Sequence, residues 1–297
     1  MEKLNKLFSN IIRVVVKDKE HPWANSLEQL DWVQTNIKNI KALIKTKNSP
    51  ATRKNYYLAF GKVYEALGDD VTYKAFKKLA VKEQNKIKDR AKHQKLSDAR
   101  IKKFVDWSTL IKKRDQLAKT FMHDKSNNQL NLQYLLMALY IYLPIRNNYV
   151  NVKIVDKMPC DNDNNYLLKV GDKYIFYLNK DKVSHVKGGT VYPFTKTMSK
   201  IITNSLKAYP REYLLGSMTK RNVIYQLNKM FPDKTVSIVN IRSAKISHFY
   251  NQNKSVAQKQ KLAKRMRHSV SEAIYSYQKV VNNKKIEKMK IKRLKAI

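Results

Sequence analysis

Residues 166–194 read YLLKVGDKYIFYLNKDKVSHVKGGTVYPF and interrupt an otherwise helical pattern. Three segments within this stretch are rich in β-branched and aromatic residues: 166–170, 174–178 and 190–194. Such residues favour strands, and the intervening pairs Gly171-Asp172 and Gly188-Gly189 are typical of turns. The stretch therefore predicts a small antiparallel β-sheet.

The rest of the chain has a helical pattern. Only 6 Gly and 7 Pro occur among 297 residues, and apolar residues recur at three- and four-residue spacing outside the sheet. Ser26 and Ser49 are suited to cap two helices, and Gly68 to end the second. Further helices are expected over residues 81–93 and from Ser97. We therefore expect a mainly α protein with a small antiparallel β-sheet, of the α+β class.

Composition divides the chain into four parts: a basic N-terminal segment (1–25), a helical domain (26–122), a domain that contains the sheet (123–280) and a basic C-terminal tail (281–297). The apolar run from Leu135 to Leu143 is far shorter than the roughly 18 residues that span a bilayer, so it predicts a buried core helix. The tail has a narrow apolar edge, and a segment of this kind rarely folds alone. We expect it to be exchanged between protomers.

The charge balance points to a polyanionic partner. Lys and Arg number 61 against 23 Asp and Glu, a formal net charge of +38. An anionic membrane surface is the less favoured partner, because basic residues run along the whole chain instead of flanking an apolar anchor. Nucleic acid is the favoured partner. The basic stretch 74–103 itself is read as a solvated helix face.

Cysteine usage and the N-terminus indicate an intracellular protein. The single Cys160 cannot form an internal disulfide, no Cys/His cluster has zinc spacing, and MEKLNKLFSN lacks the apolar core of a signal peptide. We expect no metal and no cofactor. Abundant Lys, Asn, Ile and Tyr suggest an AT-rich genome, such as that of a virus or mobile element.

Four places after residue 128 carry residues suited to phosphodiester chemistry. They are Arg146 in LPIRNNYV, a lysine in NKDKVSHVKGG, Arg242 in VNIRSAKISHFY, and His268 with Tyr277 in MRHSVSEAIYSYQK. Guanidinium groups can neutralise the phosphate oxygens, an ammonium can protonate the departing 5′-oxygen, and a phenol can attack. This set could break DNA without a metal ion.

Two of these assignments have competitors. The lysine is Lys182, with Lys180 and Lys187 as alternatives. The nucleophile is Tyr277, with Tyr275 as the alternative. Two positions apart on a helix, the tyrosines point about 200° from one another, so only one of them can face the phosphate.

These residues and their order resemble the tyrosine recombinase (integrase) family over most of the chain. The segment NKDKVSHVKGGTVYPF is similar to the corresponding segments in integrases of giant viruses, virophages and related eukaryotic elements. The resemblance implies a SAM-like core-binding domain that clamps DNA (26–122), followed by a catalytic domain (123–280). It implies Arg146 and Arg242 as phosphate ligands, Lys182 as general acid on a hairpin, and a nucleophile nine positions after a histidine, as Tyr277 follows His268.

The function implied is site-specific recombination of double-stranded DNA through a 3′-phosphotyrosine intermediate, by a tetramer assembled on the DNA. A DNA-associated location follows, whether in the nucleus, the cytoplasm or a viral factory.

The sequence departs from the family pattern at two positions. The family usually has His three positions before its second arginine, where this chain has Val239, with Lys245 and His248 as nearby substitutes. It usually has Gly before the His-Ser pair, where this chain has Arg267.

Two other functions remain open. A type IB topoisomerase uses the same chemistry, but it usually has Ser-Lys four and three positions before its tyrosine, where this chain has Ala273 and Ile274. A DNA-binding relative that has lost catalysis is the other alternative, supported by Val239.

The first prediction concerns DNA binding. If the two domains clamp a duplex from opposite faces, affinity should come mainly from phosphate neutralisation and should weaken steeply as salt increases. Fluorescence anisotropy with a short duplex at low and moderately high ionic strength measures this. An affinity that barely changes would contradict the clamp.

Overall fold

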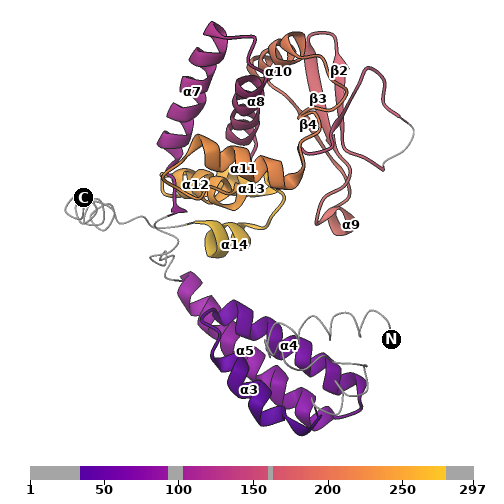
Figure 1. Ribbon diagram of the computed structural model, residues 1–297, viewed down its shortest axis with the longest axis vertical. Helices are drawn as coiled ribbons and strands as arrows, with labels where there is room; N and C mark the ends of the chain where they lie inside the picture. Colours follow the sequence, from indigo (N-terminus) through magenta and orange to yellow (C-terminus); the bar gives the residue numbers. More distant parts are fainter. Residues whose placement is uncertain (1–33, 93–102, 160–162, 279–297) are drawn as a thin grey trace, which may run out of the picture. The chain divides into compact units, whose positions relative to one another are not determined.

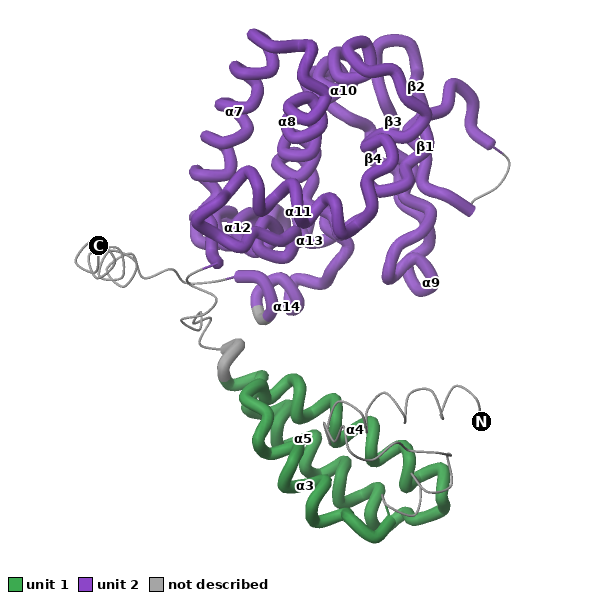
Figure 2. Tube along the Cα trace, viewed as in Figure 1, with its two compact units in different colours: residues 1–93 green, residues 94–297 purple. Residues whose placement is uncertain are grey.

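The computed structural model describes residues 34–92, 103–159 and 163–278. The chain divides between His93 and Gln94 into two compact units, coloured separately in Figure 2. The expectations for Ser26, Ser97, Cys160, the N-terminal segment and the tail 281–297 fall outside the described residues.

Unit 1 consists, in its described part, of helices α3 (Ile37–Lys45), α4 (Pro50–Ala66) and α5 (Asp70–Lys92) (Figure 1). Ser49 caps α4 by accepting a hydrogen bond from the amide of Thr52 at 3.4 Å. Gly68 follows the end of α4 with φ of +76°, a conformation that glycine adopts without strain. The expected cap and stop are therefore confirmed, whereas α5 begins earlier than the expected residue 81.

The core of unit 1 is built around Phe76 of α5, which is fully buried. The rings of Phe60 and Tyr64 on α4 stack on it at centroid distances of 6.2 and 5.5 Å. Gly61 lies opposite, where an added Cβ would meet the Cβ of Phe76 at 3.4 Å. Glycine at this position thus lets α4 and α5 approach closely, while the lysines of residues 74–88 stay exposed as a solvated face.

Unit 2 is organised around helix α8 (Asn128–Tyr142), which lies between α7 (Trp107–His123) and the sheet (Figure 1). Residues 135–141 are all buried, so the expected core helix is confirmed. Helix α7 packs on α8, which places it in unit 2. The division between the two units at residues 93 and 94 therefore lies earlier in the chain than the expected domain boundary after residue 122. No helix in the described ranges is long and apolar enough to cross a membrane.

The sheet of unit 2 has four strands in the order β1-β2-β3-β4. Strands β2 (Tyr166–Val170), β3 (Lys173–Leu178) and β4 (Thr190–Pro193) pair antiparallel, close to the expected bounds. Strand β1 (Lys153–Val155) was not expected, and it pairs with β2 in parallel, so the sheet is mixed. The α+β fold class is confirmed.

The remaining elements carry the C-terminal half of unit 2. The short helix α9 (Ser184–Lys187) projects beyond the ends of β3 and β4 (Figure 1). The others follow β4 in this order: α10 (Lys196–Ala208), α11 (Lys220–Met230), α12 (Ile238–Tyr250), α13 (Val256–Arg265), α14 (Val270–Glu272) and the π-helical turn η1 (Ala273–Tyr277). Side chains on most sides of α12 are buried, and η1 packs against it.

The second prediction concerns the core of unit 1. Replacing Phe76 by Ala should destabilise this unit by about 3–5 kcal/mol, because a fully buried aromatic ring leaves a cavity. Hydrogen exchange of the full chain would measure the loss, as faster exchange of amides in residues 37–92 with little change in residues 107–278. The control is Lys82→Ala on an exposed site of α5, which should change neither. Equal exchange in wild type and Phe76→Ala would contradict this account of the core.

Candidate active site

Arg242 on α12 is the most deeply buried charge among the predicted site residues, with 1% of its surface exposed. Its Nη1 donates to the carbonyl of Pro144 at 2.5 Å, and its Nη2 to the carbonyl of Met266 at 3.1 Å. The guanidinium thus joins the loop after α8 to the end of α13. Its Nε is buried and has no hydrogen-bond partner within the described residues.

His268 lies two residues after Met266, the residue that ends α13, and it is also buried, at 6% exposed. Its Nδ1 is 3.0 Å from the carbonyl oxygen of Ser269. A carbonyl can only accept, so Nδ1 carries the hydrogen and Nε2 of the neutral ring is a bare acceptor. This Nε2 is buried and unpartnered among the residues described.

The surroundings of His268 keep its ring neutral. Burial is the main cause that lowers its pKa to about 4, and the positive charges of Arg242, Arg146 and Lys187 lower it further. The site is therefore already rich in positive charge before any ligand binds.

Tyr277 completes the cluster at the end of η1. The ring of His268 lies against its ring at a centroid distance of 5.4 Å and an interplanar angle of 25°. The guanidinium carbon of Arg242 lies 4.9 Å from the centroid of the Tyr277 ring. Three of the five predicted catalytic residues are therefore brought together. The side chain of the alternative nucleophile, Tyr275, lies outside the described residues.

Arg146 lies close enough to this cluster for its charge to lower the pKa of both Arg242 and His268. It also lines a cavity of about 510 Å³, together with Lys180, Lys182 and Lys220. Asp163 and Asp181 also line this cavity, but they form ion pairs with Lys180 and Arg267, so the lining keeps an excess of positive charge, which suits an anionic ligand.

The three candidate lysines have different surroundings. Lys180 forms an ion pair with Asp163 at 2.9 Å. Lys182 is exposed and lines the same cavity as Arg146. Lys187, at the end of α9, contributes to the lowered pKa of His268. The ion pair makes Lys180 the least available of the three, and Lys182 and Lys187 are the two candidates with exposed side chains.

The position of the absent histidine does not face the cluster. Val239 is 60% exposed at the start of α12. Of the two nearby substitutes, Lys245 places its Nζ 4.3 Å from the ring centroid of Trp107, and the His248 ring lies 6.4 Å from the same ring. Both side chains therefore pack on α7 and not on Tyr277.

The ion pair between Arg267 and Asp181 was not predicted from the sequence. Arg267 appeared there only as a departure from the family pattern, yet its side chain forms a buried bidentate contact with Asp181. One signal was present: Asp181 is the only acidic residue between residues 173 and 211, inside a lysine-rich loop. A single carboxylate in such a loop indicates an ion pair with one of the cations of the fold.

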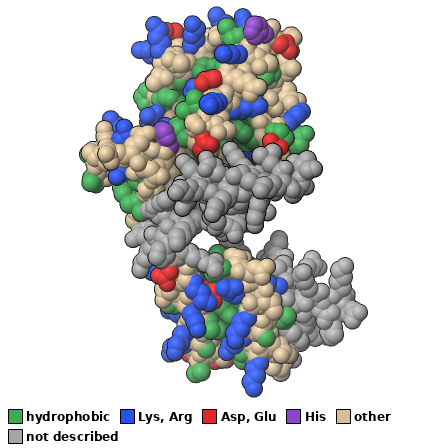
Figure 3. All heavy atoms as spheres, turned by 90° about the vertical axis from the view of Figure 1, so that its left-hand side faces the viewer, with side chains coloured by type: hydrophobic (Ala, Val, Ile, Leu, Met, Phe, Trp, Pro, Cys, Tyr) green, Lys and Arg blue, Asp and Glu red, His purple; other side chains and the backbone are tan. Residues whose placement is uncertain are grey.

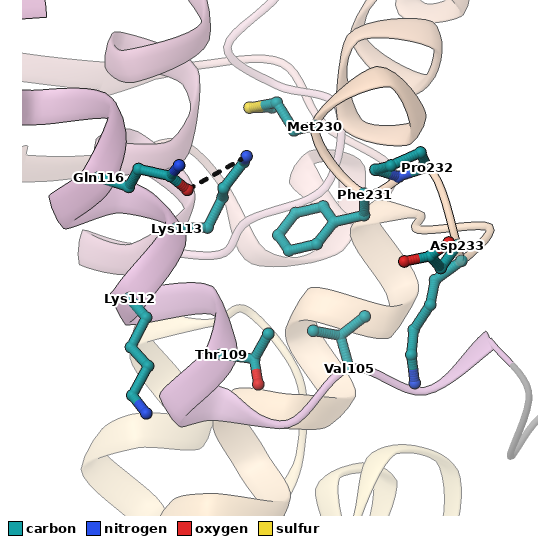
Figure 4. Close-up of a pocket in the computed structure, with 10 residues that line it drawn as sticks. Val105, Thr109, Lys112, Lys113, Gln116, Met230, Phe231, Pro232 and Asp233 are labelled. Atoms are coloured by element: carbon teal, nitrogen blue, oxygen red, sulfur yellow. Dashed lines mark hydrogen bonds between the residues drawn. The ribbon is translucent and has the colours of Figure 1, made fainter. Parts of the chain in front are cut away.

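A second cavity, of about 350 Å³, lies between α7 and the segment after α11 (Figure 4). Figure 4 shows Phe231, Val105 and Met230 around it, with the hydrogen-bonded pair Lys113 and Gln116 on α7. None of the predicted catalytic residues lines it.

Comparison with known proteins gives a likeness to solved structures and none to known sequences. No protein-family model matches the chain, and no curated protein matches it. Among solved structures, the crystal structure of XerA recombinase covers 98% of this chain and 98% of its own, with a TM-score of 0.40 and 12% identity. The residues of the site, and not this likeness, support the proposal below.

The third prediction concerns pH. Because the folded pKa of His268 is about 4 and its ordinary value is 6.5, the unfolded chain binds a proton in this window that the folded chain does not. The free energy of unfolding should therefore fall as pH drops from about 6.5 to about 4, by roughly 3 kcal/mol at most. Urea unfolding of wild type and His268→Gln across this range measures the difference, and the variant should lose less.

The matched control is His248→Gln. Partial burial and the charge of Lys245 also lower the pKa of His248, but its side chain is more exposed than that of His268, so removing it should change the pH dependence less. Identical pH profiles for wild type and His268→Gln would contradict the neutral buried ring.

Proposed function

We propose that this protein is a site-specific DNA recombinase that cleaves and rejoins strands through a 3′-phosphotyrosine link at Tyr277. One observation carries the proposal: Arg242 and His268 each hold a buried nitrogen without a partner in the described chain, and both pack against the ring of Tyr277. Buried polar groups are normally satisfied, so such orphans indicate a missing ligand. A phosphate oxygen beside Tyr277 would satisfy the donor Nε of Arg242, and the proton released by the attacking phenol would satisfy the acceptor Nε2 of His268.

The mechanism follows from these groups. The phenol oxygen of Tyr277 attacks phosphorus, and its proton passes to the bare Nε2 of His268. The protonated ring then donates to a non-bridging oxygen, whose negative charge raises the low pKa of His268. Arg242 and Arg146 neutralise the developing charge on the phosphorane.

The departing group also needs a proton. As the bond from phosphorus to the 5′-oxygen breaks, the electron pair stays on that oxygen, and Lys182 supplies the proton. The products are a 3′-phosphotyrosine and a free 5′-hydroxyl. Rejoining is the reverse, with a 5′-hydroxyl as nucleophile and Tyr277 as leaving group. No step calls for a metal ion or cofactor.

Double-stranded DNA is the substrate that the charge favours. Figure 3 shows Lys and Arg side chains spread over the described surface of each unit on the face in view. A net charge of +38 supports binding to phosphate along an extended duplex. We assign the clamp to the helical N-terminal domain, catalysis to the domain that contains the sheet, and assembly into a tetramer to the tail 281–297.

A second candidate is a DNA-binding protein that has lost catalysis. It is favoured by one observation, the exposed Val239 at the position where the family usually has a histidine, with no substitute brought to Tyr277. In our proposal His268 takes over as proton acceptor. The two candidates differ in whether a covalent adduct forms.

The fourth prediction is that adduct. A nicked suicide substrate, made from DNA of the chain's own genetic element and losing its short 5′-hydroxyl fragment on cleavage, should trap protein covalently on the 3′-phosphate. Wild type should form the adduct with or without EDTA. Tyr277→Phe should bind the same DNA and form none, since it loses only the attacking hydroxyl. Denaturing gel electrophoresis measures the shift.

Tyr275→Phe is the matched control, because it removes a hydroxyl two positions away on the same turn. It should form the adduct. An adduct with Tyr277→Phe but none with Tyr275→Phe would move the nucleophile to Tyr275. No adduct with wild type would favour the protein without catalysis.

A further inference from the structure

Arg267 has a backbone conformation that arginine rarely adopts. Its φ is +56°, directly after Met266, the C-cap of α13. Its amide donates to the carbonyl of Lys264 at 3.0 Å, and the amide of His268 donates to that of Ala263 at 3.1 Å. These two bonds form a Schellman ending, in which glycine is the usual left-handed residue. An arginine is strained there, so its side chain must provide something that glycine cannot.

The side chain of Arg267 uses all three of its nitrogens. Nε and Nη2 donate to the two carboxylate oxygens of Asp181 at 2.8 and 3.0 Å. Nη2 also donates to the carbonyl of Gly188 at 2.8 Å, and Nη1 donates to the hydroxyl of Thr190. The charged side chains are almost completely buried, with 4% of Arg267 and 2% of Asp181 exposed.

These partners bracket the segment that carries two candidate lysines. Asp181 immediately precedes Lys182, and Gly188 immediately follows Lys187. Arg267 therefore holds both ends of the segment 181–188, which runs from the end of β3 through α9.

Asp181 also shapes the inside of this segment. Its carboxylate accepts from the amide of Val183 at 2.9 Å, and its carbonyl accepts from the hydroxyl of Ser184 at 3.0 Å. One carboxylate thus sets the turn into α9 and connects that turn to Arg267. The next residue along the chain from Arg267 is His268, in the cluster with Tyr277.

Lysine at position 267 could not reproduce this arrangement. A guanidinium presents a fixed planar fork that matches a carboxylate at two points, whereas an ammonium is a single point charge. A buried ion pair also adds little net stability compared with apolar packing, because both charges lose their hydration. What the contact fixes is the position of the segment.

We propose that Arg267 is a positioning residue: through Asp181, Gly188 and Thr190 it fixes the segment 181–188 beside His268, so that a lysine of this segment reaches the departing 5′-oxygen. This inference rests on the proposed function and deepens it. Arg267 itself does not touch the phosphate. It acts through the lysine, as an aid to proton donation.

The test compares two leaving groups. A suicide substrate with sulfur in place of the bridging 5′-oxygen releases a thiolate, which needs no proton, whereas the oxygen substrate needs the lysine. Arg267→Gly, which suits the left-handed backbone, should form the adduct about 100-fold more slowly than wild type on the oxygen substrate. On the sulfur substrate it should be within about threefold of wild type, since general acid catalysis no longer contributes.

Three variants keep the test decisive. Asp181→Asn retains the size of the side chain and should show the same selective loss, which covers the case in which Arg267→Gly does not fold. Lys182→Ala and Lys187→Ala on the same two substrates identify the acid, because of these two variants only the one that lacks the acid gives a loss that sulfur restores. Circular dichroism of each variant checks folding.

Arg211→Ala is the matched control. Arg211 is another partly buried arginine of unit 2, bonded to Ser205, Tyr209 and Leu214, none of which belongs to the site. Its loss should slow both substrates by the same factor, if at all. This is the pattern that a purely structural role would give.

The outcomes separate the two proposals. Sulfur rescue of Arg267→Gly and Asp181→Asn supports the positioning role. Equal slowing on both substrates overturns that role and leaves the proposed function intact. Absence of an adduct with wild type on both substrates overturns the proposed function and the positioning role with it.

Discussion

The buried guanidinium of Arg242 is the interaction on which the site depends. It bonds to carbonyl groups from two segments far apart in the sequence, at Pro144 and Met266, and it lies over the ring of Tyr277. No carboxylate pairs with it among the described residues. Burial lowers its pKa, as expected for a charge removed from water. A cation held in this way by neutral groups is stabilised further when an anion arrives, so fold and ligand binding share one residue.

Local sequence was a good guide where local chemistry decides the structure. Strands β2, β3 and β4 are encoded in β-branched and aromatic side chains, and Ser49 caps its helix through a bond three residues away. Strand β1 has only three residues and depends on its partner β2, so its own sequence was too short to predict a strand. Likewise, α7 is amphipathic in isolation, and only its packing on α8 assigns it to unit 2.

The candidate site shows the same difference between features set by neighbours in the chain and features set by contacts across the fold. The residue types and the spacing between His268 and Tyr277 led to a cluster that the structure brings together. The tautomer of His268 could not be read from sequence, because it depends on a carbonyl placed by the turn. The lysine assignment was open for a related reason: three lysines lie within one loop, and contacts across the fold, not neighbours in the chain, distinguish them.

The ion pair of Arg267 and Asp181 also constrains how this sequence can change over time. Changing either residue alone leaves the other as an unpaired charge in a buried place, which is far more costly than losing both. The two positions should therefore be inherited together. A relative with glycine at the position of Arg267 has no buried cation there, and so it needs no acid at the position of Asp181.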